Sequence, residues 1–198
     1  MADVATSPGL VMRPLVMTSI APRQLLRLKS WLPRDASSAQ PSFGDLLLPT
    51  RVGDIAGATT RALCLGPTEW LLIAPAGTHD DAALRALDVR MAGQGIALVD
   101  ASDALSGVLL QGAAARDVLA GACGIDLHPA RFPAGRCVRT RFAQVATVIV
   151  HRGDAEGYEL LVARSHADYL QDWLDDAISL EAGSAHGNPV AMPMRVAS

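Results

Sequence analysis

Residues 63–75 of the 198-residue sequence place a carboxylate next to a large aromatic side chain. The stretch reads LCLGPTEWLLIAP, in which Glu69 and Trp70 follow a Gly-Pro turn between two apolar runs. A glutamate beside an aromatic ring can have a raised pKa when it is buried, so the stretch is a candidate site. If EWLLIA forms a strand, however, Glu69 and Trp70 point to opposite faces of it. We therefore expect no shared pocket, and we expect Trp70 either to fill the core or to anchor a partner protein.

A group of arginines is the second candidate for chemistry. Its members lie close together in the sequence: Arg131, Arg136, Arg139 and Arg141. On an extended strand Arg139 and Arg141 project from the same face as Cys137. Such a face could grip a carboxylate, a phosphate or an acidic partner, or it could be a solvated sheet edge that its charge protects from pairing. Both interpretations stay open, and these arginines, with the tryptophan of LGPTEWLLIAP, are our candidates for contact with a partner.

Two further groupings indicate catalysis only weakly. Cys123 and His128 lie in GACGIDLH and could be imagined as a thiolate and its base. The cysteine follows a predicted helix, at the negative end of its dipole, which disfavours a thiolate. Asp100 and Asp103 flank a predicted turn and could act as general bases, but aspartates in turns more often cap the backbone. We therefore expect Cys123 to pack at a helix end and both aspartates to cap the turn.

The motifs that bind common cofactors are absent from the sequence. There is no Walker A loop, no GxGxxG after a strand, no HExxH and no paired metal-ligand spacing. The three cysteines include no CxxC pair, which argues against a disulfide framework or a thiolate metal site. The five histidines are scattered over the chain, at positions 79, 128, 151, 166 and 186. We expect no catalytic residue, no cofactor-binding residue and no metal site on this chain.

Composition indicates an ordinary globular protein. Half of the residues are apolar, 19% are charged and 4% are aromatic, with a formal net charge of -3. This balance gives no pull toward nucleic acid or an anionic membrane. Lys29 is the only lysine, which argues against Schiff-base catalysis, and no window approaches a membrane span. We expect a cytoplasmic protein with an aliphatic core that binds neither nucleic acid nor membrane.

Sequence periodicity predicts a sheet with helices packed on it. Strand-like segments lie at 24–32, 61–65, 69–74, 96–100, 107–112, 136–142, 145–150 and 158–163. Helices are expected at 78–92, 113–123 and 165–178. The first and last of them begin at capping-box patterns, Thr78 with Asp81 and Ser165 with Asp168. Because the strands pair as hairpins and do not alternate strictly with helices, the predicted fold class is α+β with a mainly antiparallel sheet.

The two ends of the chain differ in composition from its centre. Residues 1–22 and 181–198 are rich in Pro, Gly and small residues without a sustained period. We expect a poorly ordered segment at 1–22, a single α+β domain at 23–180 and a flexible tail at 181–198. Residues 33–60 are expected to mix a short helix with turns.

Three stretches resemble the gamma subunit of heterotetrameric sarcosine oxidase. They are LGPTEWLLIAP (65–75), VDASDALSGVLLQGAAARDVLAGACGIDLHPARFPAG (99–135) and LLVARSHADYLQDWLDDA (160–177). The resemblance implies a fold similar to the folate-binding domain of the glycine-cleavage T-protein. The complex of that family demethylates sarcosine to glycine with release of hydrogen peroxide, and with tetrahydrofolate as acceptor it forms 5,10-methylene-tetrahydrofolate.

The same resemblance implies a division of roles among four subunits. FAD and FMN lie in the beta subunit or at its border with alpha, NAD and the folate site belong to alpha, and zinc belongs to delta. The gamma subunit is a structural and assembly subunit whose main contact is alpha, with beta and delta in the same complex. This division agrees with the absence of cofactor motifs in the chain.

Two alternatives stay open beside that expectation. One is a stand-alone folate-dependent, aminomethyltransferase-like one-carbon enzyme, with the arginine group holding a glutamate tail and Asp100 or Asp103 as base. The other is the equivalent subunit of a related N-methyl amino acid dehydrogenase.

Overall fold

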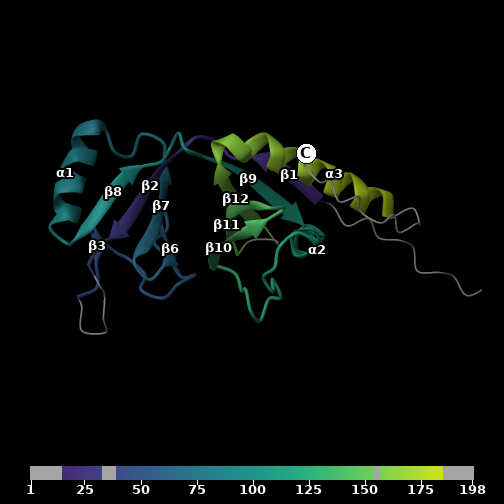
Figure 1. The fold of residues 1–198 in the computed structure, drawn as a ribbon, viewed down its shortest axis with the longest axis horizontal. Coiled ribbons are helices and arrows are strands. Elements are labelled where there is room, and N and C mark those ends of the chain that lie inside the picture. The colour runs from purple at the N-terminus through teal and green to yellow at the C-terminus, as the bar shows by residue number, and fades with distance from the viewer. Residues whose placement is uncertain (1–14, 33–38, 154–156, 185–198) are drawn as a thin grey trace, which may run out of the picture.

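In the part of the chain that the structure describes, two five-stranded antiparallel sheets pack against each other, beside a separate two-stranded sheet (Figure 1). The structure is a computed structural model that describes residues 15–32, 39–153 and 157–184. The first sheet has the strand order β5 (Ile55–Ala56), β6 (Arg61–Gly66), β7 (Glu69–Pro75), β2 (Arg23–Ser30) and β8 (Ile96–Asp100). The second sheet has the order β1 (Leu15–Ser19), β9 (Leu105–Gly112), β12 (Tyr158–Ala163), β11 (Val145–His151) and β10 (Cys137–Phe142).

Helices cover the outer face of each sheet. They are α1 (Asp81–Ala92), α2 (Ala115–Ala120), the 3-10 turn η1 (Arg164–His166) and α3 (Ala167–Ser184). Leu87 and Met91 of α1 pack with the first sheet, and Leu170 and Leu174 of α3 pack with the second. The layers therefore run helix, sheet, sheet, helix, with α1 at one end of the molecule in Figure 1 and α2 and α3 at the other.

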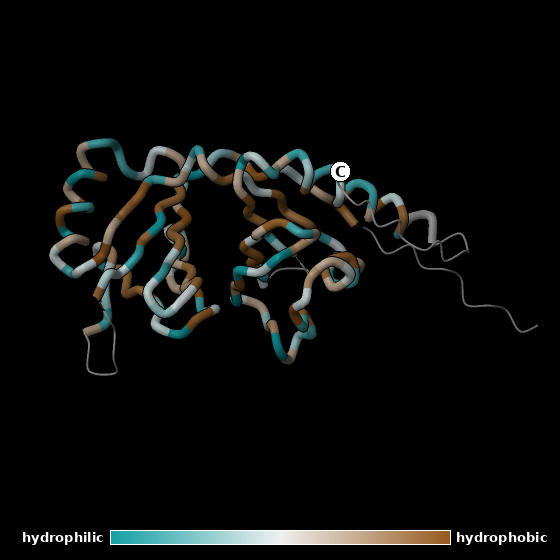
Figure 2. The backbone as a smooth tube through the Cα atoms, viewed as in Figure 1, coloured by the Kyte–Doolittle hydropathy of each residue, from teal (hydrophilic) through white to brown (hydrophobic). Residues whose placement is uncertain are grey.

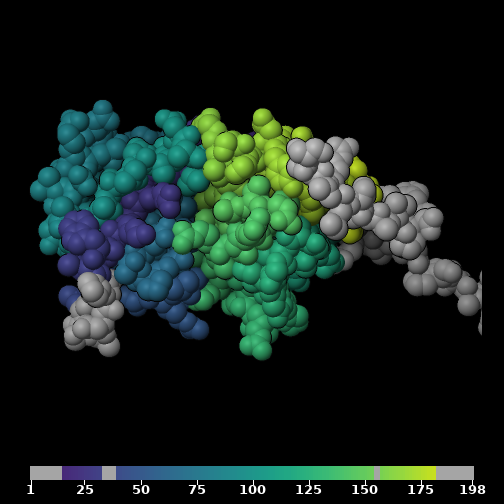
Figure 3. All heavy atoms as spheres, in the orientation of Figure 1, coloured from purple at the N-terminus to yellow at the C-terminus, as the bar shows by residue number. Residues whose placement is uncertain are grey.

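A third apolar cluster, here named the inter-sheet core, joins the two sheets. Its buried residues come from both: Leu25, Leu63, Leu71 and Ile73 from the first sheet, and Cys137, Val148, Val150 and Leu161 from the second. Figure 2 shows apolar residues concentrated in the strands of both sheets, and Figure 3 shows the two halves in contact along their boundary. Burial of this aliphatic surface is what holds the sheets together.

The fold class expected from the sequence is confirmed. Every strand pair in the described residues is antiparallel. The hairpin of LCLGPTEWLLIAP is present as β6 and β7. The strands predicted at 96–100 and 158–163 have these bounds in the structure, and the strand predicted at 24–32 is β2, which ends two residues earlier, at Ser30.

Strand β1 lies inside the segment 1–22, for which we expected poor order. Its residues pair with β9 in antiparallel register, from Leu15 opposite Gly112 to Ser19 opposite Val108. Without β1, β9 would present a row of unpaired backbone groups at the sheet edge, so this pairing stabilises both strands. The expectation is wrong for residues 15–19, and residues 1–14 lie outside the described residues.

The stretch 33–60 contains no helix in its described part, 39–60. It forms the short hairpin β3 (Ser42–Phe43) and β4 (Leu46–Leu47), followed by β5. Three of its glycines have φ between 59° and 89°: Gly44, Gly53 and Gly57. This left-handed backbone is incompatible with a right-handed helix, so the predicted short helix is wrong over these residues.

Helix α1 begins three residues later than the capping pattern predicted. Asp80 is its N-cap, because the Asp80 side chain accepts a hydrogen bond from the Ala83 backbone N–H at 2.8 Å. The Thr78 hydroxyl instead donates to the Pro75 carbonyl oxygen at 2.6 Å and closes the preceding turn. At the other end of the chain α3 continues through Ser184, beyond the point where the tail was expected to begin.

Candidate functional site

Trp70 lies in the core between α1 and the first sheet. Its side chain is 1% exposed, and the indole Nε1 donates a hydrogen bond to the Pro49 carbonyl oxygen at 2.7 Å. Leu28 and Leu72 belong to the same cluster. Of the two alternatives for Trp70, the core position is the one the structure shows. A side chain this deeply buried offers no surface to a partner, which corrects its place among the interface candidates.

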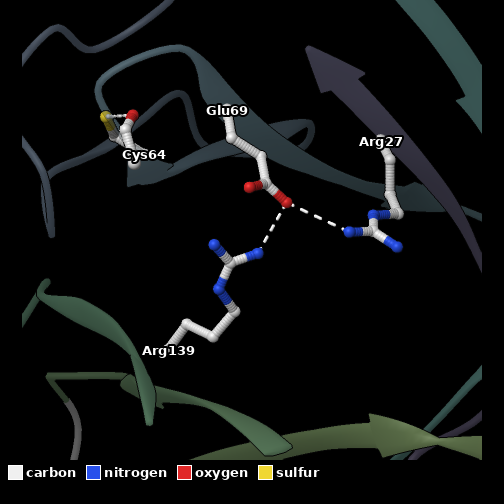
Figure 4. Close-up of polar contacts among 5 residues, drawn as sticks. Arg27, Cys64, Glu69 and Arg139 are labelled. Carbon is white, nitrogen blue, oxygen red and sulfur yellow. Dashed lines mark hydrogen bonds and ion pairs between the residues drawn. The ribbon is translucent and has the colours of Figure 1, made fainter.

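Glu69 points to the opposite face of β7 and connects the two sheets (Figure 4). Its Oε1 accepts hydrogen bonds from Arg139 Nη1 of β10 at 2.6 Å and from Arg27 Nη2 of β2 at 3.0 Å. Partial burial raises the pKa of the Glu69 carboxyl. The bonds and charges of Arg139 and Arg27 outweigh that effect, so the pKa lies below its usual value. Glu69 is thus an ionised structural carboxylate, and the expected separation from Trp70 is confirmed.

The four arginines of the second candidate group do not converge on one binding site. Arg136, just before β10, forms an ion pair with Asp54 and donates from Nη2 to the Val52 carbonyl oxygen at 3.0 Å, which joins it to the segment just before β5 at the edge of the first sheet. Arg141 Nη2 donates to the Gln144 carbonyl oxygen at 3.1 Å, inside its own hairpin. The side chain of Arg139 binds Glu69.

Arg131 is exposed and lies in the loop before β10. Strand β10 is an edge of the second sheet, which agrees with the interpretation of these arginines as charges at a sheet edge. Contact of these arginines with a partner stays a prediction.

A second carboxylate, Glu159, was not singled out in the sequence. Like Glu69 it binds two arginines, and here both arginines come from the other sheet. Glu159 of β12 is fully buried. Its Oε1 accepts from Arg23 Nη2 at 2.5 Å, and its Oε2 accepts from Arg61 Nη2 at 2.9 Å. Burial raises the pKa of Glu159, but the bonds and charges of Arg23 and Arg61 outweigh burial and lower it overall. The sequence held one indication of this buried carboxylate: Glu159 is the single charged residue in YELLVA, a strand with residues buried on both faces.

A groove opens beside this ion-pair cluster. Its volume is about 350 Å³. It is lined by Pro22, Arg23, Thr59, Arg61, Ile73, Ala74, Pro75 and Ala76. The two arginines that hold Glu159 are therefore also lining residues of a groove.

Of the two aspartates expected to cap the turn, Asp100 does so, whereas the Asp103 carboxylate makes no hydrogen bond within the described residues and only its backbone oxygen accepts, from Arg164 Nε at 2.8 Å. Asp100 Oδ1 accepts from the Ser102 backbone N–H at 2.8 Å and from the Ser102 hydroxyl at 2.6 Å, which is the backbone cap expected in this turn. His128 Nδ1 accepts from the Ala130 backbone N–H at 3.3 Å. Among the described residues no hydrogen bond joins His128 to Cys123. Cys123 lies just after α2, and its backbone forms an isolated antiparallel β-bridge with Phe142.

The other two cysteines are buried thiols. Burial raises the pKa of Cys137 to about 12, and the neighbouring Cys64 adds to the rise. Burial also raises the pKa of Cys64. Both therefore stay protonated at neutral pH, where a thiol is a poor nucleophile and a poor metal ligand. Within residues 15–32, 39–153 and 157–184, no three His, Cys, Asp or Glu side chains gather as a metal site requires.

We expect replacement of Glu69 by Gln to lower the free energy of unfolding by about 1 kcal/mol at pH 7, since both arginines are partly exposed and can rehydrate. Because the folded-state pKa of Glu69 is lowered, its stabilisation is present above the unfolded pKa of about 4.3 and is lost as the pH falls through the folded value. Urea denaturation at several pH values measures this.

Arg141→Gln is the matched control, because it leaves the contacts between the sheets in place. It should change stability by less than about 0.5 kcal/mol. A loss for Glu69→Gln that is as large at about pH 2 as at pH 7 would contradict the electrostatic assignment.

No helix in the described residues combines the length and the apolar run that crossing a bilayer requires.

Comparison with known proteins identifies related chains. A family model described as "Sarcosine oxidase, gamma subunit family" matches residues 33–180. Curated proteins named sarcosine oxidase subunit gamma match over 134 residues, with 34% identity in an Arthrobacter species and 36% in Corynebacterium sp. strain P-1. Each match covers 67% of this chain and 64% of the relative. The chain thus spans just under two thirds of the length of the curated relatives it matches.

Two solved structures are similar to the fold. A chain of the heterotetrameric sarcosine oxidase from Corynebacterium sp. U-96, in complex with pyrrole 2-carboxylate, matches with a TM-score of 0.74 and 28% identity, over 91% of this chain and 89% of that one. The glycine cleavage system aminomethyltransferase T from Bartonella henselae matches with a TM-score of 0.55 and 21% identity, over 85% of this chain and 48% of that one. The second likeness concerns the fold alone, and it confirms the expected resemblance to the T-protein.

Proposed function

The chain belongs to the sarcosine oxidase gamma subunit family, and from this we propose that it is the gamma subunit of a heterotetrameric sarcosine oxidase. In that role it supports assembly and supplies no catalytic group. The complex oxidatively demethylates sarcosine to glycine, releases hydrogen peroxide and passes the one-carbon unit to tetrahydrofolate.

The observation that carries the proposal is the likeness along nearly the whole chain to a subunit of a heterotetrameric sarcosine oxidase. A role without catalysis is supported by what the reactive side chains do. Glu69 and Glu159 are ion-paired between the sheets, and Asp100 caps a turn. Cys64 and Cys137 are buried thiols of raised pKa. These contacts support a role in which none of these groups acts as an acid, a base or a nucleophile.

The cofactors of the complex follow from the same proposal. FAD, FMN, NAD, zinc and tetrahydrofolate are held by the alpha, beta and delta subunits, with alpha as the main contact of this chain. The complex works in the cytoplasm. These assignments rest on family membership, and the lack of a Walker A loop or GxGxxG motif in the sequence agrees with them.

An exposed apolar pair at the end of β2 supports contact with a protein partner. Trp31 is 58% exposed and Leu32 is 48% exposed. The Trp31 backbone N–H is held by the Gly95 carbonyl oxygen at 3.1 Å, so the indole is presented from a fixed backbone. Tryptophan is enriched at the energetic centres of protein interfaces. Trp31, and not the buried Trp70, is therefore our candidate for an interface tryptophan.

Co-expression with the other three subunits tests assembly. A tagged form of this chain should retain the alpha subunit through affinity purification and gel filtration. Trp31→Ala should fold normally and recover alpha at least about threefold less well, as expected for loss of an interface tryptophan worth about 1 kcal/mol or more. Val89→Ala is the control, because Val89 is also an exposed apolar residue but lies on α1. A chain that purifies alone from these cells would sink the proposal.

The second candidate function is a stand-alone folate-dependent one-carbon enzyme, which the likeness in fold to the T-protein favours. It needs a free base and a gathered arginine group. Asp100 is instead bonded to Ser102, and Arg136, Arg139 and Arg141 each bind a different acceptor. Asp103 is the base that this candidate would have to use, because its carboxylate makes no hydrogen bond within the described residues. Calorimetric titration of the isolated chain with tetrahydrofolate discriminates, since only the enzyme would give saturable heat. The equivalent dehydrogenase subunit would instead assemble into a complex that consumes sarcosine without releasing peroxide.

A further inference from the structure

The groove beside Glu159 contains more hydrogen-bond donors than the protein uses. Each arginine side chain carries five N–H donors. Among the described residues Glu159 is the only hydrogen-bond acceptor for the side chains of Arg23 and Arg61, and it takes one bond from each. The two side chains are only 19% and 20% exposed, so their remaining donors are partly withdrawn from water. Donors in that condition are costly unless an acceptor satisfies them.

The charge of the cluster also favours an anion. Two guanidinium groups face one carboxylate, which leaves a net charge of +1. The other side chains that line the groove include no acidic residue that could neutralise it. The local field at the groove therefore attracts negative charge, although the whole chain is acidic.

The rest of the lining selects the kind of anion. Apart from the arginines, Thr59 is the only lining residue with a polar side chain, and the remainder are proline, alanine and isoleucine. A volume of about 350 Å³ lies at the lower end of the range for small-molecule sites. A planar carboxylate matches the forked donors of a guanidinium, and an apolar body would cover the apolar lining.

We propose that this groove binds a carboxylate group carried on a small apolar body, held by Arg23 and Arg61. The proposal rests on the groove and its two arginines and not on the chain's proposed role in assembly. The carboxylate can belong to a free small acid or to an acidic residue of a partner subunit, and the recognition chemistry is the same for both.

Sodium isobutyrate is the probe, titrated into the ¹⁵N-labelled full-length chain while the arginine Nε–H signals are followed by NMR. Two arginine signals should shift saturably, with a Kd on the order of 1–10 mM, as expected for a small ligand held by one group. Isobutyramide has the same shape without the charge and should produce no saturable shift. Equal shifts with both probes would overturn the proposal.

A matched pair of variants places the binding in the groove. Thr59→Glu puts a carboxylate at the exposed rim beside both arginines, and it should weaken isobutyrate binding by about tenfold or more by occupying their donors. Ala58→Glu adds the same charge one residue away, at an exposed position outside the lining, and should keep the Kd within about twofold. Circular dichroism confirms that both variants are folded. Equal affinity in the two variants, or no saturable shift of wild type below about 50 mM, would refute the site.

Recovery of the co-expressed alpha subunit identifies the source of the carboxylate. If a partner subunit supplies it, Thr59→Glu should reduce recovery of alpha while Ala58→Glu does not. If the ligand is a free acid, both variants should recover alpha equally. Because the NMR titration uses the isolated chain, its result stands whether or not the chain assembles.

Discussion

Replacing Glu159 with alanine is expected to lower the free energy of unfolding by about 3–5 kcal/mol, because two arginine charges then lose the buried counter-charge that pairs with them. Glu159 is fully buried on β12, and both arginines come from the opposite sheet. Removing the carboxylate leaves Arg23 and Arg61, which both lie on the first sheet, without the one side-chain acceptor that they have among the described residues. Urea denaturation followed by far-ultraviolet circular dichroism at pH 7 measures the change.

Glu69→Ala is the matched control for that experiment. Glu69 also lies between two arginines, but its partners Arg27 and Arg139 have side chains 56% and 42% exposed. Water can solvate them once the carboxylate is gone, so the loss should be about 1 kcal/mol. Similar losses in the two variants would mean that burial does not decide the strength of these contacts, and would contradict the prediction.

Replacing Trp70 with alanine is the second large expected effect, a loss of about 3–5 kcal/mol in the free energy of unfolding. The indole fills the core between α1 and the first sheet, so its removal leaves a cavity. It also leaves the Pro49 carbonyl oxygen without its donor, which adds to the cost. The measurement is again urea denaturation of the full-length chain.

Trp31→Ala provides the comparison within one residue type. Because Trp31 is 58% exposed, its loss should change stability by less than about 0.5 kcal/mol. Trp70→Phe should recover part of the loss, since it keeps an aromatic ring and loses only the Nε1 donor and some volume. If Trp70→Ala were as mild as Trp31→Ala, Trp70 could not be a core residue.

Strands and helices were predicted correctly where residues close together in the sequence determine them. Two short apolar runs on either side of a Gly-Pro turn predicted β6 and β7, and the glycine after α1 marked its end. Strand β1 was missed because its partner, β9, is about ninety residues away in the chain, and nothing within Leu15–Ser19 indicates that pairing. The start of α1 was misplaced because Thr78 and Asp80 are both good caps, and only the path of the preceding turn decides between them.

The candidate residues show the same limit more sharply. Strand alternation was enough to predict that Glu69 and Trp70 lie on opposite faces. It could not reveal that Arg139, seventy residues later, would reach Glu69 from another sheet. The arginines between positions 131 and 141 were visible in the sequence as a group, yet three of them reach acceptors in different parts of the chain. Arg136 reaches Val52, Arg139 reaches Glu69, and Arg141 reaches Gln144 in its own hairpin. Glu159 carried only the weak signal of a charge inside a buried strand.

Sarcosine-dependent release of hydrogen peroxide tests the central claim most directly. It should be measured for this chain alone, for the alpha, beta and delta subunits together, and for the complete complex at equal concentrations. We predict that the chain alone releases none and shows no flavin absorbance, while adding it to the other three subunits increases the amount of assembled, active complex. Peroxide release by the chain alone would contradict the claim that it is an assembly subunit without a catalytic site.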